Sequence, residues 1–243
     1  MPSIIPGRKP VIEALKAGTY IERIVLLRGV QGTVITELRA LAERKNVAVV
    51  ELPREEFRAI ADDATTQGVI AVVAQKNLTS IESMLNIPVE RNQKGFLLLL
   101  DGIEDPQNLG ALIRTAECAG VHGVVLPKHH AASVNSTVVK ASAGATEHMA
   151  IAEVTNLVST IEELKEAGYW IVGLDASGEK LYMEVDYSTP VAVIVGSEGK
   201  GMRRLVRENC DHLVKIPVLG KVQSLNASVA GALVMYEVVR RRS

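Results

Sequence analysis

The chain has 243 residues, of which 47% are hydrophobic and 23% charged, and its formal net charge is −1. This length allows one large domain or two small ones, and no apolar run approaches the roughly 20 residues that cross a bilayer. A charge near zero gives no bulk attraction to nucleic acid, so any RNA must be bound by local patches. The two cysteines lack CxxC spacing and cannot form a disulfide scaffold, which favours a reducing compartment. We therefore expect a globular, cytoplasmic protein.

The first 76 residues alternate between helical and strand patterns. Alternation of this kind is typical of a mainly parallel sheet covered by helices, so residues 1–76 are expected to form a small α/β domain. This segment holds 11 basic and 9 acidic residues, a balance of +2. The expected helices are 9–17, 34–45 and 54–61, and the expected strands are 24–27, 47–52 and 69–74.

Residues 77–93 are more polar and are expected to form a linker with about one helical turn. A second α/β domain is expected at 94–243. It begins with the apolar run 95–100, which is typical of a central parallel strand buried on both faces. Further strands are expected at 123–126, 149–154, 170–174, 191–195 and 213–216, and helices within 101–120 and at 157–167, 202–209 and 225–242.

Three strand ends of the second domain carry polar loops that contain glycine, at 101–110, 196–201 and 217–226. Ligands of open parallel sheets bind beyond the carboxyl ends of the strands, and glycine lets the backbone approach them closely. Each loop alone could be a tight turn with an Asn or Ser cap, and Asn108 is a good N-cap candidate. The 196–201 loop lacks the Lys-Ser/Thr of a phosphate-binding P-loop and the dinucleotide GxGxxG, so neither nucleotide hydrolysis nor nicotinamide binding is expected.

The same three loops carry motifs in a fixed order. Asn108–Arg114 reads NxGxxxR, Gly196–Met202 reads GxExxGM, and Ile216–Ala230 reads IPVxGxxxSLNASVA. In this order they resemble the SpoU/TrmH branch of the SPOUT RNA 2′-O-ribose methyltransferases. Two departures are apolar exchanges, with Val218 where methionine is usual and Ala227 where valine is usual.

This resemblance implies a fold, a cofactor and a set of site residues. The fold would be a small L30e-like RNA-binding domain followed by an α/β methyltransferase domain with a mainly parallel sheet and a C-terminal trefoil knot. The knot follows from the resemblance alone, because general folding rules are against knots. S-adenosylmethionine (AdoMet) would lie in bent form in the knotted loops, its adenosine surrounded by backbone at Gly196, Ile216 and Leu225. The polar catalytic set would be Asn108, Arg114, Glu198, Ser224 and Asn226.

The chemistry of ribose methylation places the strictest requirements on the role of Arg114. The methyl group of a sulfonium is already activated, so an enzyme must align the attack and handle the proton of the ribose 2′-OH. The family gives this task to the arginine that matches Arg114, but a guanidinium stays protonated at ordinary pH. We therefore expect Arg114 to stabilise the developing alkoxide and grip a neighbouring phosphate, with deprotonation left open. The alternative is a structural salt bridge, for example to Glu117.

The other polar members of the set also have structural alternatives. Glu198 is expected to orient Arg114 or a substrate hydroxyl. Ser224 and Asn226 are expected to hydrogen-bond near the ribose or to cap the last helix, and the two tasks are compatible. Outside the motifs, Cys118 is expected in the core, no metal site is expected, and a basic helix face at 203–207 could contact phosphates.

The leading hypothesis is an AdoMet-dependent RNA ribose methyltransferase acting on a guanosine in the P loop of 23S rRNA. The alternatives are a tRNA or another rRNA nucleotide, and a non-catalytic RNA-binding module with the same fold. Residues 1–76 would capture RNA, while 94–243 would hold the cofactor.

A homodimer built on the C-terminal helix is also expected, because this helix is apolar over most of its girth. The apolar positions form two stripes, one of Leu225, Val229, Leu233 and Tyr236 and one of Ala230, Val234 and Val238.

Overall fold

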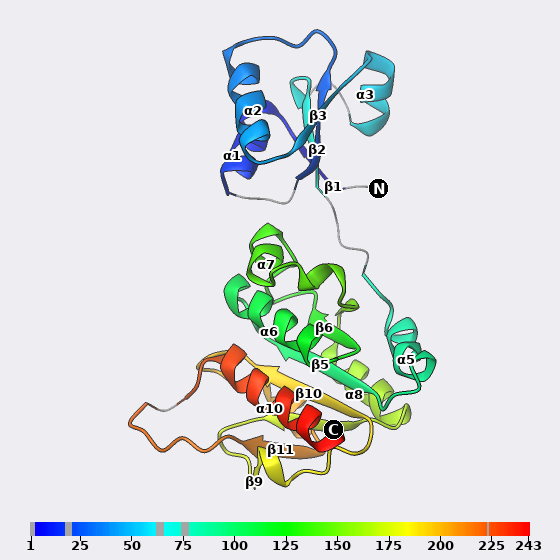
Figure 1. The fold of residues 1–243 in the computed structure, drawn as a ribbon, viewed down its shortest axis with the longest axis vertical. Helices are drawn as coiled ribbons and strands as arrows, with labels where there is room; N and C mark the ends of the chain where they lie inside the picture. The colour runs from blue at the N-terminus through cyan, green and yellow to red at the C-terminus, as the bar shows by residue number, and fades with distance from the viewer. Residues whose placement is uncertain (1–2, 18–20, 62–65, 74–77, 223) are drawn as a thin grey trace. The chain divides into compact units, whose positions relative to one another are not determined.

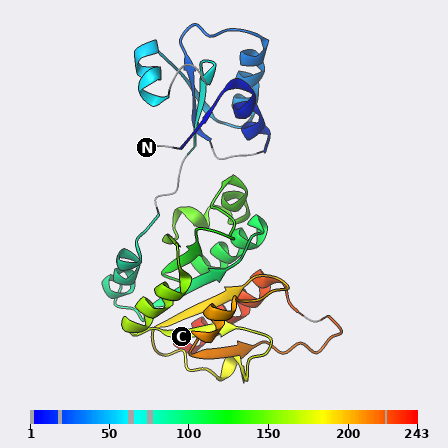
Figure 2. The ribbon, with the colours of Figure 1, turned by 180° about the vertical axis from the view of Figure 1, so that it is seen from behind.

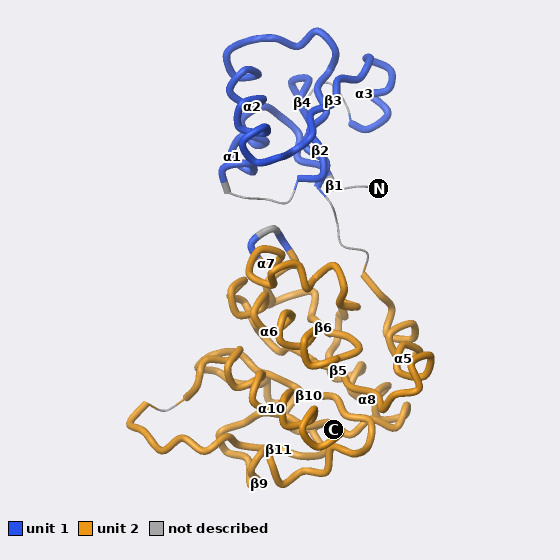
Figure 3. Tube along the Cα trace, in the orientation of Figure 1, with its two compact units in different colours: residues 1–77, 135–137 blue, residues 78–134, 138–243 orange. Residues whose placement is uncertain are grey.

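The computed structural model describes residues 3–17, 21–61, 66–73, 78–222 and 224–243. The chain divides into two compact units, which are coloured separately in Figure 3. The first unit comprises residues 1–77 with 135–137, and the second comprises 78–134 with 138–243.

The first unit is built on a four-stranded sheet in the order β1-β4-β2-β3. Helices α1 and α2 pack on one face and α3 on the other (Figure 1). Only β2 and β3 pair in parallel, since β4 runs antiparallel to both β1 and β2. The mainly parallel sheet expected here was wrong, because β4 lies between β1 and β2 and runs antiparallel to both, and strand direction cannot be read from the local pattern of β4. The elements are β1 Ser3–Pro6, α1 Arg8–Ala17, β2 Ile21–Leu27, α2 Thr33–Arg44, β3 Ala48–Leu52, α3 Arg54–Ile60 and β4 Val69–Val73.

The second unit is built on a seven-stranded sheet in the order β7-β6-β5-β10-β8-β11-β9, with parallel pairing throughout. Every residue of the central strand β5 is buried, as expected for a strand covered on both faces. The sheet confirms the predicted mainly parallel α/β fold, and its strand order is consistent with the knotted topology. The strands are β5 Phe96–Asp101, β6 Gly123–Pro127, β7 Ile151–Val154, β8 Trp170–Leu174, β9 Lys180–Leu181, β10 Val191–Gly196 and β11 His212–Lys215.

Two layers of helices enclose this sheet (Figures 1 and 2). Helices α6, Pro106–Cys118, and α10, Ala227–Arg242, bury their apolar side chains against one face. Helices α5, Ile81–Glu90, α8, Leu157–Glu166, and α9, Arg204–Glu208, cover the other face. Shorter segments complete the unit: α7 Ser136–Ala141, η1 Ala145–Glu147 and η2 Tyr182–Glu184.

Helix α5 lies within the segment expected to be a linker with one helical turn. It runs for ten residues, is capped by Ser80, which accepts from the Ser83 N–H, and buries Met84 completely. Ile81 and Leu85 pack beside Met84 against the core, but the polar residues before the helix and the Asn86 and Pro88 inside it obscured this apolar face in the sequence. No helix among the described residues has the length and apolar character needed to cross a membrane.

Candidate active site

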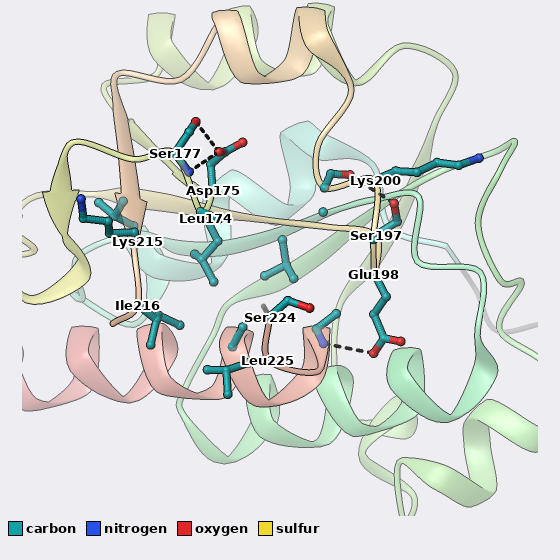
Figure 4. Close-up of a pocket in the computed structure, with 18 of the residues that line it drawn as sticks. Leu174, Asp175, Ser177, Ser197, Glu198, Lys200, Lys215, Ile216, Ser224 and Leu225 are labelled. Carbon is teal, nitrogen blue, oxygen red and sulfur yellow. Dashed lines mark hydrogen bonds between the residues drawn. The ribbon is translucent and has the colours of Figure 1, made fainter. Parts of the chain in front are cut away.

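A cavity of about 530 Å³ opens at the carboxyl ends of β8, β10 and β11. It is lined by residues from four segments, 174–177, 195–201, 214–218 and 224–230, and by Arg207. Figure 4 shows Ile216, Ser224 and Leu225 on the segments that follow β11, with Ser197 and Glu198 on the loop that follows β10. The residues expected to surround an adenosine, Gly196, Ile216 and Leu225, all line this cavity.

The loop after β10 is a tight turn closed by two backbone hydrogen bonds. The Ser197 N–H donates to the Gly201 carbonyl over 3.0 Å, and the Gly201 N–H donates back to Ser197 over 2.9 Å. Gly196 must lack a side chain here, because a Cβ atom would lie 2.3 Å from the carbonyl carbon of Gly201. The glycines of this motif therefore let the loop fold back on the end of its own strand.

Glu198 joins the three sequence motifs. Its Oε1 accepts a hydrogen bond of 3.1 Å from Asn108 Nδ2, one of 3.2 Å from the Ala227 N–H, and another from Asn226 Nδ2. Asn226 Nδ2 also donates to Asn108 Oδ1 over 2.9 Å. We call Asn108, Glu198 and Asn226 the carboxamide cluster. It brings together residues that are 118 positions apart in the chain.

The two asparagines of this cluster differ in their second task. Asn226 is the N-cap of α10, because its Oδ1 accepts from the Ser228 N–H over 2.9 Å while its Nδ2 serves the cluster. Asn108 was expected to cap α6, and this was wrong. Asp105 is the N-cap, accepting from the N–H groups of Gln107 and Asn108 at 3.2 Å each. The amide of Asn108 is therefore available to Glu198.

Arg114 lies apart from the carboxamide cluster, on an exposed face of α6. It lines neither the cavity described above nor the one described next. Within the described part of the chain it makes no ion pair, so the alternative of a salt bridge to Glu117 is not formed. Glu198 binds the two asparagines rather than Arg114. Ser224 is exposed and lines the first cavity.

A second cavity, of about 380 Å³, adjoins the same loop. Its walls include residues 101–105, Asn108, His130 and 197–203 without Gly199. Ser197, Glu198, Lys200 and Gly201 line both cavities. The loop after β10 is therefore a wall shared by two cavities, with the carboxamide cluster beside it.

Sequence reasoning missed Asp101, the last residue of β5. Its side chain is fully buried and accepts hydrogen bonds from the N–H of Arg203 at 2.7 Å and from Nε of Arg203 at 2.6 Å. The available signal was a carboxylate at the end of an otherwise apolar run. The basic face expected at 203–207 is largely paired, since Arg204 also binds Glu208 at 2.7 Å.

Two protein-family profiles match this chain. Residues 95–236 match the profile of the SpoU rRNA methylase family, and residues 4–79 match that of the RNA 2′-O-ribose methyltransferase substrate-binding domain. The chain belongs to the SpoU rRNA methylase family.

Relatives of this SpoU protein match over nearly their whole length. It is 42% identical over 240 residues to YacO of Bacillus subtilis (strain 168), assigned to the TrmH family of tRNA/rRNA methyltransferases, with 98% of this chain and 95% of the relative covered. Among solved structures, AviRb of Streptomyces viridochromogenes in complex with AdoMet superposes with a TM-score of 0.63 at 26% identity, covering 98% and 90% of the two chains. An AdoMet-bound rRNA methyltransferase of Sinorhizobium meliloti gives a TM-score of 0.63 at 27% identity, covering 98% and 86%.

The SpoU protein is thus an RNA methyltransferase of the SPOUT group that uses AdoMet. The first cavity fits this cofactor in size, because small-molecule sites commonly measure about 300–1,000 Å³. It also fits in chemistry. Ile216 and Leu225 offer apolar surface to an adenine, Gly196 offers close backbone, and Asp175 and Glu198 offer carboxylates to a cation.

The remaining sequence expectations concern cysteine and metal sites in this SpoU protein. Cys118 was expected in the core, and this was wrong, because it is exposed on the outer face of α6. Cys210 is half-buried, and burial raises the pKa of its thiol to about 12, so it is not a reactive thiolate at neutral pH. Among the described residues, no three His, Cys, Asp or Glu side chains are grouped to hold a metal ion.

Proposed function

We propose that this SpoU protein transfers the methyl group of AdoMet to a ribose 2′-OH of RNA, with a guanosine in the P loop of 23S rRNA as the substrate. The observation that carries the proposal is the shared wall between the two cavities, with the carboxamide cluster beside it. A methyl donor in one cavity and a ribose in the other would meet at this wall. A non-catalytic module would not need the cluster and the two cavities together.

In this proposal the first cavity holds the cofactor and the second receives the acceptor nucleoside. Backbone at Gly196, Ile216 and Leu225 surrounds the adenosine part. The cofactor supplies an activated methyl group when bound. Asn108, Glu198 and Asn226 keep the wall in one conformation, so that the 2′-oxygen approaches the methyl group in line. Ser224 lines the cofactor cavity and offers a hydroxyl to the ribose.

Arg114 has a different task in this proposal. It is exposed and lacks an ion-pair partner among the described residues, so its guanidinium is available to an RNA phosphate. A cation close to the 2′-oxygen also stabilises the alkoxide that develops during transfer. Because Arg114 does not line the cofactor cavity, it contributes to RNA rather than to cofactor binding, and since it does not line the second cavity either, the bound RNA must bring its 2′-oxygen to the guanidinium.

The division of tasks between segments is part of the proposal. Residues 1–76 capture RNA, as the match of residues 4–79 to a substrate-binding profile supports, and 94–243 carry out the transfer. Residues 77–93 connect the two segments.

The proposal includes a homodimer in the cytoplasm. Val229, Leu233 and Tyr236 of α10, with Leu225 just before it, leave 39–50% of their surfaces exposed along one side. Val234 and Val238 are fully buried in their own subunit, so they cannot form the second contact stripe that the sequence suggested. The exposed stripe is the surface that a two-fold contact would cover.

Alkaline hydrolysis of the product tests the reaction. RNA from a deletion strain is incubated with the protein and AdoMet that carries a labelled methyl group. A 2′-O-methyl group blocks cleavage of the adjacent phosphodiester, so the label should appear in a resistant dinucleotide of 23S rRNA that contains guanosine. Label on a base would contradict ribose methylation. Label in tRNA would favour the second candidate substrate, which the tRNA/rRNA assignment of the relatives keeps open.

A further inference from the structure

Asp101 is a buried carboxylate at the boundary of the proposed site. It ends β5, where it pairs in register with Gly196 at the end of β10. Its side chain has no exposed surface, while that of Arg203 is 54% exposed. Both carboxylate oxygens are used: Oδ2 accepts from the Arg203 N–H at 2.7 Å, and Oδ1 accepts from the guanidinium at 2.6 Å.

These two hydrogen bonds attach the end of the loop 197–203, which forms the wall between the cavities, to β5. A carboxylate is buried at a large cost unless it is hydrogen-bonded and paired, so the position of Arg203 is coupled strongly to that of β5. Met202, the residue before, is buried in the same core as β10 and α9. The backbone at 202–203 is therefore fixed to the sheet at the point where the loop ends.

The carboxamide cluster fastens the middle of the same loop through Glu198. The wall between the two cavities is thus held at two points, Glu198 and Arg203, by partners that lie outside the loop. Loss of the Asp101 contact would leave the loop attached through Glu198 to Asn108, Asn226 and Ala227, and through Met202 to the core, but would free its end at Arg203. Its position relative to both cavities would then be poorly defined.

We propose that Asp101 is a positioning residue for methyl transfer, which holds the loop 197–203 so that both cavities keep their shape. The inference rests on the proposed function in assigning the first cavity to AdoMet and the second to the acceptor nucleoside. Asp101 acts through Arg203 and the loop, without contact to the reacting atoms. Substitutions at Asp101 should therefore change cofactor affinity and turnover together.

Asp211 provides a matched control in the same unit. Its Oδ2 accepts from the Ile171 N–H at 2.8 Å, and its Oδ1 pairs with Lys165 Nζ at 2.7 Å. The arrangement repeats that of Asp101, a carboxylate shared between a backbone N–H and a cation. Asp211 lines neither cavity. Asp211→Asn should therefore lower the stability of the fold, as Asp101→Asn does, without displacing the loop 197–203.

The experiment compares Asp101→Asn, Asp211→Asn, Arg203→Lys and Arg203→Ala in the full chain. Titration calorimetry gives the AdoMet Kd, methyl transfer gives kcat and KM, and thermal unfolding gives the Tm. Asp101→Asn should weaken AdoMet at least about tenfold and lower kcat by up to about 100-fold, because misplacement by about 1 Å has effects of this size. Asp211→Asn should lower the Tm but leave Kd and kcat within about twofold of the unmodified protein.

The Arg203 variants keep the inference testable if Asp101→Asn does not fold. Arg203→Lys keeps a cation for Asp101 as well as the backbone N–H bond, so its fold should persist, whereas Arg203→Ala leaves the buried carboxylate with the N–H bond alone and should also lower the Tm. Arg203→Ala should show an intermediate loss of affinity and turnover, and Arg203→Lys should recover part of it. Equal effects of Asp101→Asn and Asp211→Asn, or no effect of Arg203→Ala, would overturn the proposal.

A further variant separates this inference from the proposed function. Gly196→Val places a side chain where no Cβ fits and should abolish AdoMet binding if the first cavity holds the cofactor. If Gly196→Val binds AdoMet normally, the assignment of the cavity is wrong. If Gly196→Val loses binding while Asp101→Asn keeps it and turns over normally, the cavity assignment stands and the role of Asp101 is wrong.

Discussion

Asn226 combines two hydrogen-bonding tasks that are usually separate. Its Oδ1 caps α10, while its Nδ2 donates to the carboxylate of Glu198 and to Asn108. A serine or aspartate could cap the helix as well, but neither could donate and accept in these directions at the same time. The residue type at 226 therefore follows from the site rather than from the helix.

Replacement of Asn226 by alanine tests whether this residue serves the site as well as the helix. Loss of the cap should cost about 1 kcal/mol of folding free energy, and loss of the cluster should also reduce methyl transfer strongly. Asn156→Ala is the matched control, since Asn156 caps α8 by accepting from the Val158 N–H at 3.0 Å and lies outside both cavities. Thermal unfolding and methyl transfer are measured for both variants. Comparable loss of activity in Asn156→Ala would show that helix capping alone explains the effect.

Arg114→Ala tests the separation of RNA chemistry from cofactor binding. Because Arg114 lines neither cavity, the AdoMet Kd should stay within a few-fold, while methyl transfer should fall by about 10²- to 10³-fold. Calorimetry with AdoMet and a transfer assay on RNA give the two quantities. A variant that keeps full activity would remove Arg114 from the proposed site.

At the scale of elements, much of the second unit could be predicted from the sequence. Its strands are short runs of apolar residues, and in its helices apolar residues recur every three or four positions. Both patterns can be read from neighbouring residues in the sequence. The antiparallel β1 and the helix α7 could not be predicted, because their partners lie far away in the chain. In the site, the motifs identified Glu198 and both asparagines, but the hydrogen bonds among them depend on tertiary folding. Asp101 ends an apolar run, but its pairing with Arg203, which lies 102 positions further along the chain, depends on tertiary folding.

The C-terminal end of α10 illustrates the same limit. Residues 240–242 form a basic end to the helix, yet Arg242 turns inward and donates to the carbonyls of Tyr187, Lys94, Gly95 and Thr189. Its guanidinium also lies 5.4 Å from the centre of the Phe96 ring. A residue that looks like a solvated charge in the sequence thus ties the last helix to the beginning of the central strand.

His122, near this junction, should make stability depend on pH. Its Nδ1 accepts from the Phe96 N–H at 3.1 Å, and burial, followed by the charge of Arg91, lowers its pKa below 6.5. In the unfolded chain the histidine takes up a proton near that value, while the folded protein keeps it neutral. Stability should therefore be fully present above pH 6.5 and fall as the pH drops below it.

Thermal unfolding between about pH 5 and 7.5 measures this effect. His122→Asn keeps an acceptor for the Phe96 N–H but cannot titrate, so its Tm should fall less on acidification than that of the unmodified protein. His129→Asn, at an exposed position, is the control. A second histidine, His212, has its pKa lowered by burial and should leave some pH dependence in both variants. Identical pH profiles for His122→Asn and the unmodified protein would contradict the prediction.

At the scale of the whole molecule, the exposed stripe of α10 is an apolar surface that has no partner within the described subunit. Leu225, Val229, Leu233 and Tyr236 are apolar over a continuous side of the helix, whereas Glu237 on another side is engaged by Arg240 and Arg241. Stripes of this kind are uncommon on monomers and mark contact surfaces.

Leu233→Arg should therefore convert a dimer into monomers and lower methyl transfer with it. Analytical ultracentrifugation at micromolar concentration measures the mass, and the transfer assay measures the activity. Leu205→Arg is the control, since Leu205 of α9 is exposed to 52% on the opposite face of the sheet. Val234→Arg is unsuitable, because Val234 is fully buried and its replacement would unfold the subunit. A stable and active monomeric unmodified protein would end the dimer proposal.

The wall shared by the two cavities also has a consequence for the order of events. Binding of one ligand orders the loop Ser197–Gly201. Part of the entropic cost of binding the other ligand is then already met. Thermodynamic reciprocity then requires that AdoMet tightens RNA binding by the same factor by which RNA tightens AdoMet binding. If Glu198 faces the sulfonium of AdoMet in the first cavity, methyl transfer would remove the positive charge that this carboxylate attracts and so weaken the product's contact with the wall. The methylated RNA and the demethylated cofactor would therefore bind less tightly in each other's presence than the two substrates do. Release of one product would then accelerate release of the other.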